Sequence, residues 1–184
     1  MEAHTASLAT IIRAAHFAAR AHAAQRRKGE AGEPYVNHLL EVAELLATHG
    51  APPEAIIAGL LHDTVEDTEV TEAELAREFG PVIAAIVLEA TDDQALPKEI
   101  RKANQVRHAP AKSAEAKRVK LADKISNLRA IAATPPTGWN HARRVEYVGW
   151  AGRVAAGLKG VNPALDAAFD ATYRATMARL AAEE

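Results

Sequence analysis

The residues at 62–67, His62-Asp63-Thr64-Val65-Glu66-Asp67, bring together several groups that can do chemistry. Glu66 follows His62 by four residues and Asp67 follows Asp63 by four, so on a continuous helix each pair would share one face. A His/Asp pair is suited to binding a divalent metal ion. A neighbouring Glu/Asp pair is suited to positioning a water and accepting its proton. This segment therefore predicts a metal centre with acid–base groups beside it.

Two residues far from this segment are candidates for completing the metal site. The helical neighbours of Asp123 are mostly small or apolar, which predicts an inward-facing carboxylate. A buried carboxylate is costly unless it is paired, hydrogen-bonded or bound to a metal. His38 shares its helical face with Val42 and Leu45, so its imidazole is also expected to point inward.

Together these candidates supply two imidazoles (His38 and His62) and two carboxylates (Asp63 and Asp123). Two carboxylates balance the charge of a divalent cation, and mixed nitrogen and oxygen ligands suit manganese, iron or zinc better than calcium or magnesium. An octahedral ion with four protein ligands keeps two open positions. The spacing alone leaves other interpretations open: core histidines, a chance His-Asp dipeptide, and an Asp123 paired with a neighbouring lysine.

The elements that must position these residues are predicted to be helices. The chain is rich in alanine, which favours helix over strand. Thr71 and Glu74 form a capping box, Ser113 and Asn162 are further helix caps, and the segment 28–35 is expected to be a loop or one short hairpin. We therefore predict an all-α, compact helical bundle in one domain spanning 1–184. Its helices are expected at about 6–26, 36–48, 53–63, 71–80, 81–90, 97–108, 113–133, 139–158 and 163–182.

Composition excludes several classes of protein. The chain has no cysteine, which rules out disulfides and thiolate metal sites. We expect a cytoplasmic protein without a membrane segment, because no apolar run reaches membrane-spanning length and the N-terminus does not resemble a signal peptide. The net charge of −2 argues against nucleic acid as a partner. Basic segments at 26–28 and 98–120 are expected either to attract a small polyanionic ligand or to form solvated helix faces.

Longer strings resemble a known family. His38, His62-Asp63 and Asp123 match the H…HD…D pattern of HD-domain phosphohydrolases. The strings at 25–28 (QRRK), 34–38 (PYVNH), 60–68 (LLHDTVEDT) and 119–129 (VKLADKISNLR) resemble the hydrolase domain of RelA/SpoT-type alarmone enzymes. The chain is most similar to the stand-alone small alarmone hydrolases, and the resemblance covers nearly its whole length.

The resemblance implies an HD-domain fold, a bound Mn²⁺ and hydrolysis of the 3′-pyrophosphate of ppGpp and pppGpp to give GDP or GTP. It assigns His38, His62, Asp63 and Asp123 as metal ligands and Glu66 and Asp67 as the catalytic acidic pair. It places Arg27, Lys28 and Asn127 at the nucleotide. Trp139, Arg143 and Tyr147 match the small hydrolases as well, and their spacing of four predicts one helical stripe that either grips the nucleotide or belongs to the core.

The sequence departs from the family pattern at two positions. Leu39 stands where a proline usually follows the histidine, and we expect this change to affect only the start of the helix. Ser126 replaces a larger, often aromatic residue, which bears on guanine packing and hence base selectivity. Two alternative functions stay open: an HD-domain phosphatase acting on another nucleotide, such as the 2′-phosphate of NADPH, and a nucleotide-binding sensor without catalysis.

Overall fold

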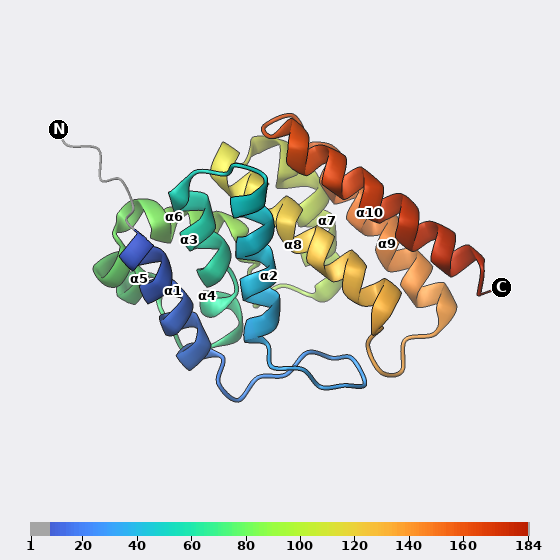
Figure 1. The fold of residues 1–184 in the computed structure, drawn as a ribbon, viewed down its shortest axis with the longest axis horizontal. Coiled ribbons are helices and arrows are strands. Elements are labelled where there is room, and N and C mark those ends of the chain that lie inside the picture. Colours follow the sequence, from blue (N-terminus) through green and yellow to red (C-terminus); the bar gives the residue numbers. More distant parts are fainter. Residues whose placement is uncertain (1–7, 184) are drawn as a thin grey trace.

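The computed structural model describes residues 8–183, and this part of the chain is built from helices joined by loops (Figure 1). In chain order the helices are α1 (Leu8–Ala21), α2 (Val36–Thr48), α3 (Pro53–Leu61), α4 (Thr64–Asp67), α5 (Glu72–Phe79), α6 (Pro81–Ala90), α7 (Lys98–His108), the 3-10 helix η1 (Ala109–Ala111), α8 (Ala114–Ala133), α9 (His141–Leu158) and α10 (Pro163–Ala181). The all-α prediction is confirmed.

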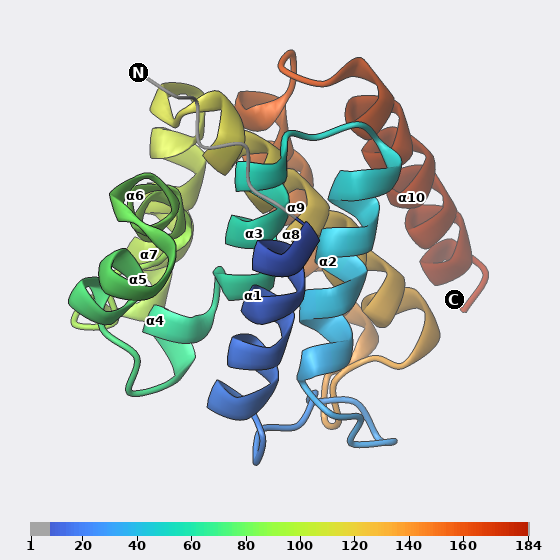
Figure 2. The same cartoon turned by 60° about the vertical axis from the view of Figure 1, so that its left-hand side comes forward.

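Helix α8 is the central element of the bundle. It packs against α2, α3 and α6 on one side and against α9 and α10 on the other. Figure 1 shows α9 and α10 together at one end, and the turned view of Figure 2 shows α1 and α2 side by side. Because α8 is surrounded, even polar residues such as Lys120, Asp123 and Lys124 are buried along it. Polar groups at the middle of the molecule must therefore find partners there.

The predicted helix caps are present. The side chains of Thr71, Ser113 and Asn162 accept hydrogen bonds from backbone N–H groups three residues further on, as N-caps do. Between α5 and α6, Gly80 has a φ of 88°, a conformation that favours glycine, and Pro81 then begins α6. These local signals explain why the predicted starts of α5, α8 and α10 agree with the structure.

One predicted helix end is wrong, and a second differs from the prediction by about two residues. The first helix ends at Ala21 rather than near residue 26, because the backbone N–H of Tyr35 donates to the carbonyl of Gln25 and draws that segment out of the helix. Helix α3 ends at Leu61, so residues 62–67 are not continuous with it. There the hydroxyl of Thr64 donates to the carbonyl of Leu61 at 2.6 Å, and such side-chain bonds compete with the helical ladder.

The segment between α1 and α2 folds back on itself. Isolated antiparallel bridges join Arg26 to Pro34 and Gly29 to Pro136, and the N–H of Arg27 donates to the carbonyl of Glu33 at 2.8 Å. The predicted hairpin is therefore limited to isolated bridges, without a named strand in the described residues. These contacts hold the segment 25–35 beside the loop that connects α8 to α9. Within residues 8–183, no helix has the length and apolar character needed to cross a membrane.

Candidate metal centre and substrate cavity

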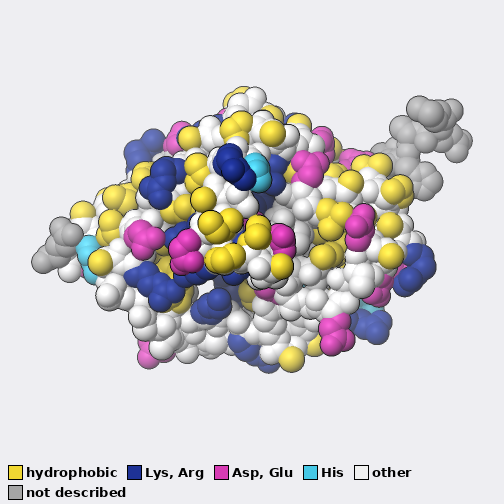
Figure 3. Space-filling view, turned by 180° about the vertical axis from the view of Figure 1, so that it is seen from behind, with side chains coloured by type: hydrophobic (Ala, Val, Ile, Leu, Met, Phe, Trp, Pro, Cys, Tyr) yellow, Lys and Arg dark blue, Asp and Glu magenta, His cyan; other side chains and the backbone are white. Residues whose placement is uncertain are grey.

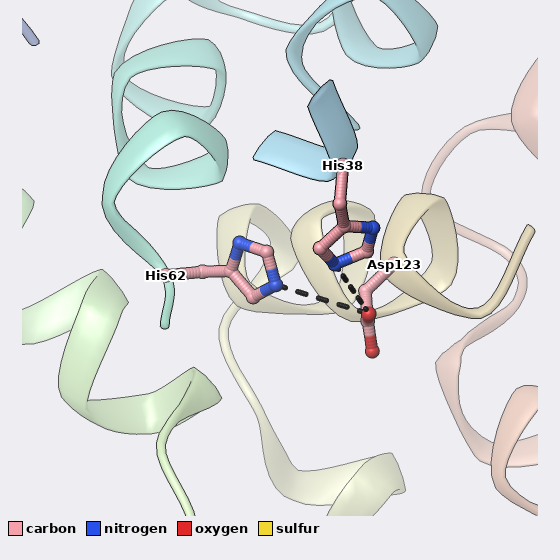
Figure 4. Close-up of side chains that lie close together, drawn as sticks. All are labelled: His38, His62 and Asp123. Carbon is pink, nitrogen blue, oxygen red and sulfur yellow. Dashed lines mark ion pairs between the residues drawn. The ribbon is translucent and has the colours of Figure 1, made fainter. Parts of the chain in front are cut away.

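The candidate metal ligands converge from three separate elements. His38 comes from the first turn of α2, His62 and Asp63 from the turn between α3 and α4, and Asp123 from the middle of α8. Nε2 of His38 lies 3.4 Å from Oδ1 of Asp123, and Nε2 of His62 lies 3.8 Å from the same oxygen (Figure 4). One ligand atom from each of these three buried residues lies within 4.8 Å of the other two.

Asp63 adds a second carboxylate to this group. Its Oδ2 lies 3.1 Å from Nε2 of His62 and 3.7 Å from Nε2 of His38. The hydroxyl of Tyr35 donates to the same Oδ2 at 2.7 Å, which fixes the orientation of the carboxylate. The structure thus brings together all four residues that the sequence proposed as ligands.

The arrangement fits a divalent ion. Nδ1 of His62 is held at 2.9 Å from the carbonyl oxygen of Gly59, while its Nε2 is buried and makes no hydrogen bond to the part of the chain that the structure describes. A buried ring nitrogen that faces two carboxylates needs a proton or a cation to be satisfied. Two imidazole nitrogens with carboxylate oxygens are a donor set for a divalent transition metal.

The electrostatics of the four groups are those of a site that exchanges a proton for a cation. Burial lowers the pKa of His38, although Asp123 partly offsets this effect. Burial acts in the same direction on His62, but Asp63 and Asp123 outweigh it and raise the pKa of His62 to about 10. Burial opposes ionisation of Asp63 and Asp123, yet neighbouring cationic groups hold the pKa of both carboxyls below the ordinary value. A metal ion would take over the role of the His62 proton.

Asp123 has further partners on its own helix. The side-chain amide of Asn127 donates to Oδ1 at 2.6 Å, and Nζ of Lys124 lies 3.0 Å from Oδ2 and 4.7 Å from the ring centroid of Trp150. The carboxylate of Asp123 therefore forms an ion pair with the neighbouring Lys124 and also faces the two imidazoles. Lys120 instead donates to the carbonyl of Ala90.

Glu66 and Asp67 point in different directions. Asp67 is exposed on the cavity wall, where its Oδ2 accepts a hydrogen bond from Gln25 at 2.8 Å. Glu66 is partly buried and accepts from the backbone N–H of Asp92 at 3.0 Å and from Gln94 at 2.7 Å. Burial raises the pKa of Glu66, and the negative charge of Asp63 adds to this effect. The predicted stacking of His62 with Glu66 on one continuous helix is replaced by a short turn between them.

A cavity of about 870 Å³ opens beside the ligands. His38 and Asp67 are among its lining residues. Its cationic lining residues include Arg26, Arg27, Lys28, Lys98, Lys102 and Arg143. Its acidic lining residues are Glu33, Glu41, Asp67, Glu99 and Glu146. On the molecular face shown in Figure 3, basic side chains are likewise interspersed with acidic and apolar ones. Arg129 is a seventh cationic lining residue, so cationic side chains outnumber acidic ones in the lining, and this modest excess of positive charge is suited to a small polyanion.

The predicted nucleotide-contacting residues lie around this cavity. Arg27 donates to Oδ1 of Asn127 at 3.0 Å, so a chain of contacts runs from Arg27 through Asn127 to Asp123. Lys28 is exposed at the cavity edge, next to the bridge between Gly29 and Pro136.

The aromatic stripe also lines the cavity. The guanidinium of Arg143 lies 4.4 Å from the ring centroid of Trp139, and the rings of Trp139 and Tyr147 are 5.5 Å apart. The prediction that all three share one helix is wrong for Trp139, because Asn140 caps α9 and Trp139 precedes it. The three side chains nevertheless meet, since the backbone N–H of Trp139 donates to the carbonyl of Pro136 and holds the ring beside the first turns of α9.

Sequence reasoning missed several supporting residues. Tyr35 and Gln25 contact the two acidic residues Asp63 and Asp67, and Ser126 contacts His38 rather than serving only as part of the cavity wall. Tyr35 and Gln25 lie within the strings at 34–38 and 25–28 that resemble the family, and this resemblance was the one sign in the sequence that they belong to the site. The spacing of residues along the sequence does not predict the contact between Ser126 and His38, which are 88 residues apart.

Comparisons with known proteins agree with this geometry. A model of the HD domain matches residues 14–148. The guanosine-3′,5′-bis(diphosphate) 3′-pyrophosphohydrolase MESH1 of Danio rerio is 47% identical over 162 residues, which cover 87% of this chain and 90% of the relative. The human MESH1 is 45% identical and covers 90% of this chain and 94% of the relative. A GTP pyrophosphokinase of Streptomyces coelicolor is 41% identical over 131 residues, only 15% of its own length.

Solved structures include a close match. A structure described as a metazoan ortholog of SpoT that hydrolyzes ppGpp and plays a role in starvation responses aligns with a TM-score of 0.88 and 38% identity. The alignment covers 92% of this chain and 96% of that one. Similarity of this extent, together with the convergence of His38, His62 and Asp123, shows that the chain belongs to the HD-domain family and, within it, to the family of the MESH1 proteins.

Proposed function

We propose that this protein is a Mn²⁺-dependent hydrolase that removes the 3′-pyrophosphate of ppGpp and pppGpp, with GDP or GTP and pyrophosphate as products. The observation that carries this proposal is the placement of four ligand residues, His38, His62, Asp63 and Asp123, beside a cavity lined by cationic side chains. Relatives named for this reaction cover about nine tenths of the chain, which supports the choice of substrate.

His38, His62, Asp63 and Asp123 would hold the ion. When bound, Mn²⁺ supplies Lewis-acid activation of water and neutralises charge that develops on the phosphoryl oxygens. Tyr35 and Asn127 keep the two carboxylates oriented toward it by the hydrogen bonds described above. The donor set does not by itself select Mn²⁺ over iron or zinc, and the family resemblance makes Mn²⁺ our choice.

Glu66 and Asp67 are proposed to handle the proton of the attacking water. The water oxygen forms a bond to the phosphorus attached to the 3′ oxygen, and the bond from that phosphorus to the 3′ oxygen breaks. One proton passes from water to the acidic pair, and the 3′ oxygen leaves with a proton as a hydroxyl. Asp67 faces the cavity, and the raised pKa of Glu66 suits a group that both accepts and returns a proton.

The nucleotide is proposed to lie across the cavity. Arg27 and Lys28 would contact phosphate, where the planar guanidinium can bind two oxygens at once. Asn127 would hydrogen-bond the nucleotide, and Trp139, Arg143 and Tyr147 would contact the base, the ribose or the distal phosphates. The one-domain organisation over 1–184, the cytoplasmic location and the absence of a nucleic-acid partner stay predictions from the sequence.

A product assay tests the proposal. The purified protein is freed of metal, supplied with Mn²⁺ or left without it, and given ppGpp and NADPH in parallel reactions. GDP and pyrophosphate formed only with Mn²⁺ are the expected products. Release of phosphate from NADPH without turnover of ppGpp would contradict the proposed substrate. If neither compound is hydrolysed, and Glu66→Ala binds ppGpp as the wild type does, the protein is a sensor rather than an enzyme.

A further inference from the structure

A line of hydrogen bonds leads away from the far nitrogen of His38. Oγ of Ser126, on α8, lies 2.8 Å from Nδ1 of His38. The same hydroxyl donates to Oε2 of Glu41, on α2, at 2.6 Å. Arg129 donates to the other oxygen of Glu41 at 2.9 Å. Ser126 and His38 are only 1% and 3% exposed, so the bond between them is formed in the interior, where an unmatched polar group is costly, whereas Glu41 and Arg129 reach the surface.

The positions of the protons follow from the capacities of the groups. The carboxylate of Glu41, paired with Arg129, can only accept a hydrogen bond. Ser126 has one proton and gives it to Glu41, so toward His38 it can only accept. The proton on the His38 ring must therefore be on Nδ1. Nε2 is left with its lone pair toward Asp63 and Asp123, at 3.7 and 3.4 Å.

We infer that Ser126 and Glu41 are positioning residues that fix the ring orientation and the tautomer of His38 for metal binding. His62 has an equivalent support, because its Nδ1 faces the carbonyl oxygen of Gly59. One imidazole is thus held by the backbone and the other by a two-residue side-chain relay. Support of this kind sets ligand orientation and basicity in metal sites. The inference rests on the proposed metal site, and it gives position 126 a role other than packing against the base.

The experiment compares three variants of the whole 184-residue chain. Ser126→Ala removes the acceptor for Nδ1–H, and Mn²⁺ affinity measured by calorimetry should fall about ten- to hundredfold. Glu41→Ala frees the Ser126 proton to turn toward His38, so its effect should be smaller and in the same direction. Thr176→Val is the matched control. Thr176 carries another buried hydroxyl, which donates to the carbonyl of Leu128 on α8, the helix that also carries Ser126. The Mn²⁺ affinity of this control should equal that of the wild type.

A second readout needs no metal. Nitrogen-15 NMR of the metal-free protein reports which ring nitrogen of His38 carries the proton, and the signal is assigned by comparison with His38→Gln. The wild type should show the proton on Nδ1, and Glu41→Ala should show a mixture of both tautomers. Since Glu41 is partly exposed, this variant carries the test if Ser126→Ala does not fold.

The two readouts separate this inference from the proposed function. A wild type whose His38 carries its proton on Nε2, or a folded Ser126→Ala variant with Mn²⁺ affinity within twofold of the wild type, overturns the inference. A wild type that binds no Mn²⁺ refutes the proposed metal site instead, and the tautomer of His38 still decides whether the relay acts as described.

Discussion

Replacing Glu66 by glutamine separates its chemical role from its structural one. The side chain accepts two hydrogen bonds, from the backbone N–H of Asp92 and from Gln94. Glutamine has nearly the same shape and keeps one acceptor oxygen, so one of these bonds can persist. Loss of the other should cost about 1 kcal/mol. For a chain of this size, that loss lowers the melting temperature by about 2–4 °C.

The expected loss of activity is much larger. A positioned acid–base group contributes about a hundredfold to ten-thousandfold in rate. At 1.36 kcal/mol per factor of ten, this range corresponds to about 2.7–5.4 kcal/mol of transition-state stabilisation. Steady-state hydrolysis of ppGpp by the Mn²⁺-loaded Glu66→Gln variant should therefore show kcat reduced by about a hundredfold or more. The melting temperature should fall by only about 2–4 °C, and Mn²⁺ affinity should stay close to that of the wild type.

Gln94→Ala is the matched control for Glu66→Gln. It removes the hydrogen bond from Gln94 but keeps the carboxylate of Glu66 and its bond from the backbone N–H of Asp92, so kcat should change less than about tenfold while the loss of stability is similar. The reasoning is refuted if Glu66→Gln retains kcat within tenfold of the wild type. It is refuted equally if Gln94→Ala loses as much activity as Glu66→Gln, since Glu66 would then act only by holding the segment after α6.

Three further predictions concern the ligands and the fold. Tyr35→Phe removes the donor to Asp63 and should weaken Mn²⁺ binding about ten- to hundredfold by calorimetry, whereas unchanged affinity would exclude the orienting role. The pKa of His62 is raised to about 10, and a metal ligand must be unprotonated. Mn²⁺ affinity should therefore rise about tenfold per pH unit below pH 10, and about one proton should be released on binding. Calorimetry in buffers of different ionisation enthalpy measures the released proton, and a pH-independent affinity would contradict the prediction. Asn162→Ala removes the cap of α10 and should lower the melting temperature by about 2–4 °C without changing ppGpp hydrolysis; an unchanged melting temperature would contradict this role.

Local signals predicted the helices well where the sequence contains a start or a stop. The bounds of α2 agree with the prediction because Gly50 follows its end, and α10 begins as predicted because Asn162 and Pro163 mark its first turn. The end of the third helix was predicted near residue 63 and lies at Leu61, and the two-residue difference was missed because its cause is a pair of side-chain bonds to carbonyls at the end of α3. Helical periodicity does not contain this information, since His62 and Asp63 have no strong breaking tendency of their own.

The same distinction applies to the site. The inward orientation of His38 and Asp123 could be predicted, because apolar neighbours at helical spacing define the buried face of α2 and α8. Tyr35 and Asp63 are 28 residues apart, and Glu41 and Ser126 are 85 residues apart. Contacts of this kind depend on how helices and loops are placed relative to one another. A single sequence contains no spacing rule for them.

The two imidazoles of the centre are prepared for a cation in different ways. His38 has a lowered pKa and a relay that holds its proton on Nδ1, so its Nε2 is available as it stands. His62 faces both carboxylates, and in the metal-free protein a proton on its ring compensates part of their charge. Binding a divalent ion therefore adds only one net positive charge to the buried site, because one proton leaves as the ion enters. Two ionised carboxylates in the interior of a helical bundle carry a large desolvation cost unless a positive charge compensates them. The exchange provides that charge both before and after metal binding, first as the proton on His62 and then as the metal ion.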